Sequence, residues 1–171
     1  TELSPSTTYC SLLRPLNELQ IARHFAALTP FHRAFLSCNV GGRDDSWCGA
    51  CPKCVFVWLM LSPFLSDEQL RAIWRRDLLL EPSTPDLLRD LVDDRLLKPL
   101  ECVGTRRECR AALGEMVRRR QEDGSAIPAP IVSLRESHGS QDFIDVLNDF
   151  NDQHHVPQRW LGRVQGLATH A

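Results

Sequence analysis

The sequence predicts a mainly α-helical chain built around one irregular, cysteine-rich loop. Apolar residues recur at spacings of three and four along several segments, which is the period of an α-helix. Residues that favour helix starts stand before these segments, and Gly or Pro follows several of them. Finally, the four cysteines Cys38, Cys48, Cys51 and Cys54 fall within seventeen residues, and a strongly apolar run follows at once.

The first expected helix covers residues 16–28, where leucines and alanines recur on one face. Asn17 is a residue type that caps helix starts, and Pro30 stops the helix. Residues 31–39 then indicate a short extended stretch that leads into the cysteines. Residues 39–46, with two glycines and two aspartates, have the composition of a loop.

The next helix should begin at Pro52, because proline is favoured in a first helical turn. Residues 53–65 are apolar on nearly all sides, so this helix should be buried all round. Ser66 and Gln69 have the spacing of a capping box, in which the two side chains satisfy backbone N–H groups at a helix start. This box predicts a helix over residues 67–76.

Two more helices follow from similar signals. Thr84 is the expected cap of one, with Pro85 at its first position and leucines on its buried face. Thr105 and Glu108 form a second capping box, and Gly124 marks the end of the helix that they begin. The buried stripe of this longer helix should comprise Cys109, Leu113, Met116 and Val117.

The last part of the chain is expected to hold a loop and two helices. Residues 125–140 contain two prolines and a glycine, which predicts a long loop. A helix is expected near residues 141–151, and a final one from Pro157 onward.

Composition limits the partners and the location. The chain has 20 Lys and Arg against 22 Asp and Glu, a formal charge of −2, so no bulk field attracts nucleic acid or an anionic membrane. The first ten residues lack the basic start and apolar core of a signal peptide. The longest apolar run, residues 55–65, is shorter than the roughly 20 residues that cross a bilayer. We therefore expect a cytoplasmic chain without a membrane or nucleic-acid partner.

The four clustered cysteines have the spacing C-x9-C-x2-C-x2-C, and the last three lie on a turn that runs into a helix start. A helix N-terminus stabilises thiolates. Zinc takes four tetrahedral thiolate ligands at about 2.3 Å. Four thiolates leave no open coordination position, so the sequence predicts a structural zinc knuckle with Cys38, Cys48, Cys51 and Cys54 as the ligands.

Other interpretations of the cluster stay open. An iron–sulfur cluster also takes four thiolates. A redox C-x-x-C pair is less favoured, since such pairs usually stand near a βαβ pattern and none is visible beside the cysteines. Four unligated buried cysteines would have no reason to gather at this spacing.

The order "RPLNELQIARHF", "SCN", "WCGACPKC" and then an apolar helix resembles the tail of the PP-loop ATP pyrophosphatase superfamily, which includes cyano-deazaguanine synthase. In that superfamily four such cysteines hold a structural zinc. The resemblance implies that the chain is the carboxyl-terminal part of an α/β PP-loop-type enzyme. It also implies two domains: 1–66 as the end of a nucleotide-binding-type domain with the knuckle, and 67–171 as a helical carboxyl-terminal region.

Four segments are similar to a more specific family: "LRPLNELQIARHFAAL", "FLSCNVGGRDDSWCGACPKCVFVWLMLSPFL", "ECVGTRRECRAAL" and the closing "VPQRW". This is the bacterial UDP-N-acetyl-α-D-muramoyl-L-alanyl-L-glutamate epimerase family. The similarity implies an isomerase of peptidoglycan precursor synthesis that uses ATP and Mg²⁺. By adenylating a carboxylate, it would convert the terminal L-Glu of UDP-MurNAc-L-Ala-L-Glu to D-Glu.

The family is much longer than this chain, which has no glycine-rich phosphate loop and does not begin with Met. The resemblance therefore implies an upstream nucleotide-binding half as partner, and a chain that is inactive alone. Three alternatives stay open: another PP-loop enzyme that modifies nucleobases or transfers sulfur, a non-enzymatic zinc module that binds protein or RNA, and an inactive truncated paralogue.

The candidate substrate-binding residues are Arg14, Asn39 and Lys53. Arg14 is either a phosphate or carboxylate ligand or a solvated surface residue, while Asn39 and Lys53 flank the cysteine cage, which could present them to a substrate. His154 and His155 have the residue type of a general base, but equally suit a helix end. The sequence assigns no catalytic acid or base.

Overall fold

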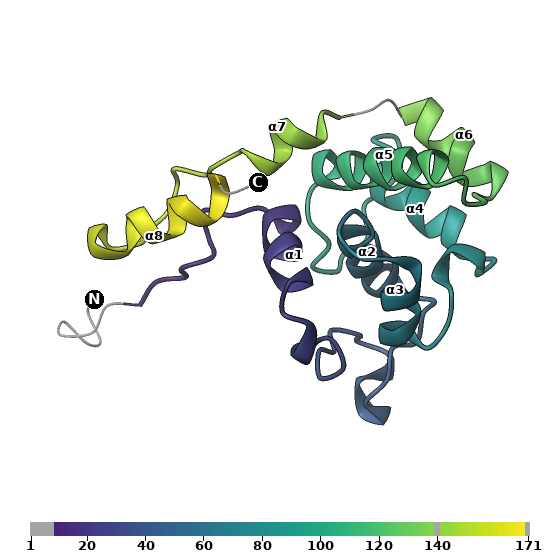
Figure 1. The fold of residues 1–171 in the computed structure, drawn as a ribbon, viewed down its shortest axis with the longest axis horizontal. Coiled ribbons are helices and arrows are strands. Elements are labelled where there is room, and N and C mark those ends of the chain that lie inside the picture. Colours follow the sequence, from purple (N-terminus) through teal and green to yellow (C-terminus); the bar gives the residue numbers. More distant parts are fainter. Residues whose placement is uncertain (1–8, 139–140, 170–171) are drawn as a thin grey trace.

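The computed structural model describes residues 9–138 and 141–169, and this part of the chain contains α-helices and 3-10 turns but no β-strand (Figure 1). The elements, in chain order, are α1 (Glu18–Ala26), η1 (Thr29–Phe31), η2 (Gly41–Asp44), α2 (Pro52–Leu61), α3 (Asp67–Trp74), η3 (Leu78–Leu80), α4 (Thr84–Val92), α5 (Arg106–Glu122), α6 (Ala129–His138), α7 (Phe143–Leu147) and α8 (Gln158–Thr169). The mainly α prediction is confirmed. The extended stretch expected before the cysteines is instead η1, a turn and an irregular segment.

Helix α2 forms the centre of the main body and contacts α1, α4 and α5. Seven of its ten residues are buried, including Trp58 and Leu59. The predicted all-round burial is therefore confirmed. Each large apolar side chain buried in this way contributes about 1.5–3 kcal/mol relative to an exposed one, so α2 holds its neighbours together.

The starts of three helices are fixed by reciprocal capping. The boxes predicted at Ser66–Gln69 and Thr105–Glu108 both form, and Asn17 caps α1 as predicted. In each box the side chain of the cap residue accepts a hydrogen bond from a backbone N–H at the helix start, and the second side chain accepts one from the backbone N–H of the cap residue. Local sequence thus decides where these helices begin.

The loop expected over residues 125–140 is present over residues 125–128, but it is wrong for residues 129–138, which form α6. Pro130 lies in the first turn of this helix, where a missing N–H costs nothing. Ile131 and Leu134 are buried where α6 packs on α4 and α5. Residues 139 and 140 lie outside the described ranges.

Helix α4 begins one residue earlier than predicted. Its N-cap is Ser83, and Thr84 is already helical. The Thr84 hydroxyl donates to the carbonyl oxygen of Leu78 at 2.6 Å, a bond that ties the helix start to η3.

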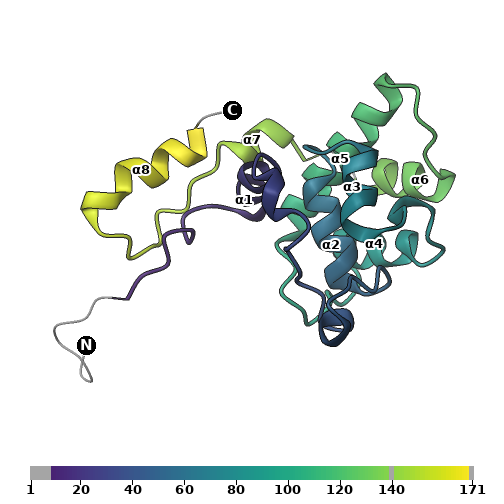
Figure 2. The same cartoon turned by 60° about the horizontal axis from the view of Figure 1, so that its bottom comes forward.

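Helix α8 lies beyond α1, away from the main body (Figures 1 and 2). The predicted last two helices are present as α7 and α8. A second, small hydrophobic cluster holds α8, and Arg23 and His24 of α1 both contact the carbonyl oxygen of Leu167. The buried members of this cluster are Leu16, Val156, Val164 and Ala168.

Helices on both sides of residue 66 share the main core, since α2 packs on both α4 and α5. The domain boundary expected at residue 66 stays a prediction. None of the helices that the structure describes has the length and apolar character needed to cross a membrane.

Candidate metal centre and neighbouring pockets

The four clustered cysteines come from one loop and one helix start. Cys38 lies before η2, Cys48 follows the loop, Cys51 is the N-cap of α2, and Cys54 lies in the first turn of that helix. The Cys51 Sγ accepts the backbone N–H of Cys54 at 3.4 Å. Gly49 has a φ of 71°, the left-handed conformation that glycine adopts without steric cost. The turn therefore returns the chain so that its thiols converge.

The four sulfur atoms all lie within 4.8 Å of one another. The Cys48 and Cys54 sulfurs are 3.6 Å apart, and all four thiols are free of disulfide bonds. A tetrahedral metal with bonds of about 2.3 Å to sulfur places its ligands about 3.8 Å from one another. The thiols are thus already gathered at nearly the required spacing, and the cluster could hold a metal ion.

The ionisation of these thiols also fits a cation site. Burial opposes ionisation of Cys38, but hydrogen bonds from the backbone N–H groups of Cys48 and Gly41, together with those from the Cys54 and Cys48 thiols, lower the pKa of Cys38 to about 6. Burial raises the pKa of Cys51 to about 11 and raises that of Cys54 as well. Four thiolates so close together repel one another, so a bound dication is what would keep them all ionised.

The cysteine loop is held by close backbone approaches. A Cβ added at Gly41 would lie 2.1 Å from the carbonyl oxygen of Ser46, and one at Gly49 would lie 2.9 Å from Cδ of Arg76. A side chain at Gly41 would require a shift of the loop backbone, whereas one at Gly49 would displace the Arg76 side chain and strain the positive φ. The knuckle therefore packs directly against the segment that follows α3.

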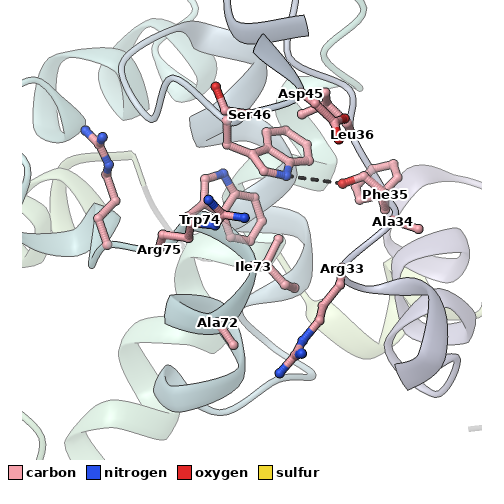
Figure 3. A pocket seen from close by; sticks show the side chains of 12 residues that line it. Arg33, Ala34, Phe35, Leu36, Asp45, Ser46, Ala72, Ile73, Trp74 and Arg75 are labelled. Atoms are coloured by element: carbon pink, nitrogen blue, oxygen red, sulfur yellow. Dashed lines mark hydrogen bonds between the residues drawn. The ribbon is translucent and has the colours of Figure 1, made fainter.

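Beside the knuckle lies a cavity of about 490 Å³ (Figure 3). Trp47, which precedes Cys48, forms part of its wall; its indole N–H donates to the Phe35 carbonyl oxygen at 3.2 Å, and its ring centroid lies 5.0 Å from that of Trp74. The lining residues come from the 33–36 turn, the cysteine loop and the end of α3: Arg33, Ala34, Phe35, Leu36, Asp45, Ser46, Trp47, Ala72, Ile73, Trp74, Arg75 and Arg76.

A second pocket, of about 390 Å³, lies at the start of α1 and α5. There the Glu108 carboxylate accepts the backbone N–H of Glu18 at 2.6 Å. Burial raises the pKa of the Glu18 carboxyl, Glu108 raises it further, and Lys53 opposes the shift. The lining residues are Arg14, Pro15, Leu16, Asn17, Glu18, Gly104, Thr105, Arg107, Glu108, Asp149 and Asn151.

The three predicted substrate-binding residues do not form one group. Arg14 lines the second pocket and is exposed. Lys53 donates to the carbonyl oxygen of Cys102 at 2.7 Å and acts electrostatically on Glu18, so it lies near that pocket. Asn39 is exposed beside Cys38 and lines neither cavity. Their binding roles stay predictions.

His154, one of the two histidines considered as a base, has a local structural role. Its ring lies edge-on to Phe150, and its Nδ1 faces the backbone N–H of Val156 at 3.2 Å. His155 is exposed in the same segment.

Sequence reasoning missed the arginines beside the knuckle, Arg33, Arg75 and Arg76. One signal was available: "AIWRRD" ends a helical pattern without the Gly or Asn that usually takes the left-handed position there. In the structure Arg75 occupies that position with a φ of 57°. Which cavity these side chains would line depends on the packing of α3 against the cysteine loop, which no local pattern shows.

Comparison with known proteins gives one consistent family. Residues 32–142 match the family model described as the MurL C-terminal domain, so the match contains all four clustered cysteines. Curated relatives named UDP-N-acetyl-alpha-D-muramoyl-L-alanyl-L-glutamate epimerase occur in Xanthomonas oryzae pv. oryzae (34% identical, covering 92% of this chain), Salinispora tropica (40%, covering 73%) and Micromonospora sp. (33%, covering 87%). No solved structure gives a significant match.

The matched region covers 37%, 27% and 34% of these three relatives, so the chain spans about a third of their length. Both the family model and the relatives agree with the resemblance that the sequence motifs indicate. The chain therefore belongs to the UDP-N-acetyl-α-D-muramoyl-L-alanyl-L-glutamate epimerase family, of which it carries the MurL C-terminal domain.

Proposed function

We propose that this chain is the carboxyl-terminal portion of an ATP-dependent epimerase that converts the terminal L-Glu of UDP-MurNAc-L-Ala-L-Glu to D-Glu. The observation that carries the proposal is the family match over residues 32–142, which encloses the four gathered thiols. The relatives are about three times as long, so we assign catalysis to a whole protein with an upstream nucleotide-binding half of the PP-loop type. The chain alone is expected to be inactive, and the whole enzyme to act in the cytoplasm.

The proposed reaction needs activation of a carboxylate. The α-proton of glutamate is very weakly acidic beside an ionised carboxylate, because its removal places a second negative charge on the same group. Adenylation by ATP, with Mg²⁺ on the phosphates, makes a mixed anhydride and releases pyrophosphate, and the anhydride can delocalise the resulting carbanion. Removal of the proton from one face and its return to the other inverts the centre, which requires one or two positioned acid/base groups. Hydrolysis of the anhydride by water then gives the D-glutamyl carboxylate and AMP.

Zinc is the proposed occupant of the four-thiol site. Thiolate sulfur is the donor that zinc prefers in closed tetrahedral sites. Four thiolates leave no position for substrate or water, so Cys38, Cys48, Cys51 and Cys54 would have a structural role. Their part is to fix the loop before α2 and, through Trp47, the wall of the cavity beside it.

Arg14, Asn39 and Lys53 remain the proposed substrate-binding residues. Arg14 and Lys53 lie at or near the pocket that holds Glu18, where two cations could bind the carboxylates of the glutamyl end of the substrate. Asn39 is exposed beside Cys38, where it could donate to a substrate held against the knuckle.

Product analysis tests this function. The full-length gene product is incubated with UDP-MurNAc-L-Ala-L-Glu, ATP and Mg²⁺, and the glutamate released by hydrolysis is resolved into its enantiomers while AMP is measured. We expect D-Glu and AMP to accumulate only when ATP is present. D-Glu no higher than in the ATP-free control rejects the epimerase, and AMP formed on a nucleobase substrate instead identifies another PP-loop enzyme.

A further inference from the structure

The cavity beside the knuckle has an excess of positive charge. Three arginines line it, Arg33, Arg75 and Arg76, against one carboxylate, Asp45. Arg76 has only a long contact of 3.7 Å with Glu81. Within residues 9–138 and 141–169, no ion pair is found for Arg33 or Arg75. The guanidinium groups of Arg33 and Arg75 are therefore not engaged by a carboxylate of the described residues and are available to an anion at this cavity.

The backbone is strained at the same place. Across the described ranges, the non-glycine residues with a positive φ are Asp45, at 47°, and Arg75, at 57°. Both line this cavity. A left-handed conformation is unfavourable for residues with a side chain, and such strain gathers at ligand-binding sites, where the surrounding structure fixes it. Arg75 takes a C-cap position that glycine would normally occupy, so the surrounding structure must hold its backbone in this conformation.

The floor of the cavity is rigid and aromatic. Trp74 is 2% exposed, and its indole N–H, although buried, has no hydrogen-bond partner in the structure. Trp47 packs against it, and its indole N–H is held by the Phe35 carbonyl oxygen. Figure 3 shows Arg33 extending from the 33–36 turn toward Ala72 and Ile73 of α3, so arginines approach the cavity from two sides.

We propose that this cavity binds a diphosphate group. Planar guanidinium forks match phosphate oxygens bidentately, and three arginines at one cavity suit an anion with two phosphates better than one with a single charge. The cavity volume, about 490 Å³, is in the range of small-molecule sites. This inference rests on the proposed function, whose substrates offer two sources of the group: the nucleoside diphosphate of the nucleotide sugar, and the polyphosphate of ATP.

Calorimetric titration and tryptophan fluorescence test the binding directly. The zinc-loaded 171-residue chain is titrated with UDP, ATP and inorganic pyrophosphate, because Trp47 and Trp74 line the site and should report occupancy. The variants are Arg33→Gln and Arg75→Gly, with Arg89→Gln as the matched control, since Arg89 is on α4 and pairs with Asp86. We expect each cavity variant to weaken binding by about tenfold or more, as for loss of a charged hydrogen bond, and the control to bind as the parent chain does.

Arg75→Gly separates a ligand role from a structural one. Glycine adopts a positive φ without steric strain, so this variant should melt at the same or a higher temperature while its affinity for the phosphate ligands falls. Tighter binding of UDP than of ATP identifies the nucleotide sugar as the source, and the reverse order identifies ATP. Failure of all three ligands to bind, or equal binding by the cavity variants, overturns the inference even if the whole enzyme makes D-Glu. Binding that depends on Arg33 and Arg75 retains it even if no D-Glu is formed.

Discussion

The described part of the chain has two hydrophobic clusters, and they are stabilised in different ways. The main core surrounds α2 and includes three of the clustered cysteines, so burial of apolar surface and the thiol site reinforce each other. The small cluster under α8 has four buried residues and relies on polar contacts between α1 and the carbonyl oxygen of Leu167. The matched family region, residues 32–142, contains most of the first core and none of the four buried residues of the second.

This difference indicates where stability and function are coupled. The main core fixes the knuckle and the arginine-lined cavity in one rigid unit. The α8 region buries little apolar surface, so we expect it to unfold locally without unfolding the main core. Loss of α8 should therefore leave the body folded, whereas loss of the knuckle should not.

The largest effect is expected from Cys54→Ser. Cys54 is fully buried, and a thiolate site for zinc contributes on the order of 10 kcal/mol to folding, which is comparable with the whole stability of a domain. The variant should retain little zinc by elemental analysis and lose its cooperative melting transition.

Cys102→Ser is the control for that variant, because Cys102 is exposed and stands apart from the cluster. It should change stability by less than about 0.5 kcal/mol. A Cys54→Ser chain that melts like the parent would show that the core folds without the knuckle.

A smaller, local effect is expected from Val164→Asp, which places a carboxylate in the small cluster, where Val164 is 5% exposed. Because an unpaired buried charge is unfavourable, α8 should detach and its amides should lose hydrogen-exchange protection. The main melting transition should move little.

Leu59→Ala in the main core is the comparison for Val164→Asp, and should cost about 2–5 kcal/mol across the whole body. If both variants lowered the main transition equally, the two clusters would be one cooperative unit.

The smallest effect concerns acid stability. Hydrogen bonds from Arg95 hold the pKa of the Asp93 carboxyl well below its usual value. A depressed carboxyl pKa stabilises the folded chain above the ordinary value of 3.8, and that stabilisation is lost as pH falls below it. Melting temperatures of Asp93→Asn measured from pH 5 to pH 2 should therefore fall less steeply than those of the parent.

Asp86→Asn provides the reference for the acid series, since Asp86 forms an exposed pair with Arg89. Its profile should follow that of the parent chain. If the Asp93→Asn profile ran parallel to the parent's, ionisation of Asp93 would make no measurable contribution to acid unfolding. Acid unfolding would then depend on the main core as a whole.

Local signals in the sequence predicted those parts of the fold that local physics decides. The caps at Asn17, Ser66 and Thr105 satisfy neighbouring N–H groups, so they could be identified from residue type and spacing. The gathering of Cys48, Cys51 and Cys54 follows similarly from a short turn into a helix start.

Tertiary packing decided what sequence reasoning missed. Helix α6 has two prolines at its start and only a short apolar stripe, so its stability depends on burying Ile131 and Leu134 against α4 and α5. No residue propensity predicts the positive φ of Arg75, because the surrounding structure imposes this conformation. The arginine-lined cavity could not be foreseen for the same reason, since it joins segments about 40 positions apart in sequence, which only the folded chain brings together.

The free thiols differ in how accessible they are to solvent and reagents. Cys102 is exposed and Cys10 partly so, whereas Cys109 is fully enclosed, and burial raises its pKa to about 12. Alkylation followed by mass spectrometry should therefore detect two adducts with the ion in place and seven after chelation, because loss of the ion opens the core that encloses Cys109. The number of alkylated cysteines thus reports whether the fold is intact, and the measurement needs no substrate.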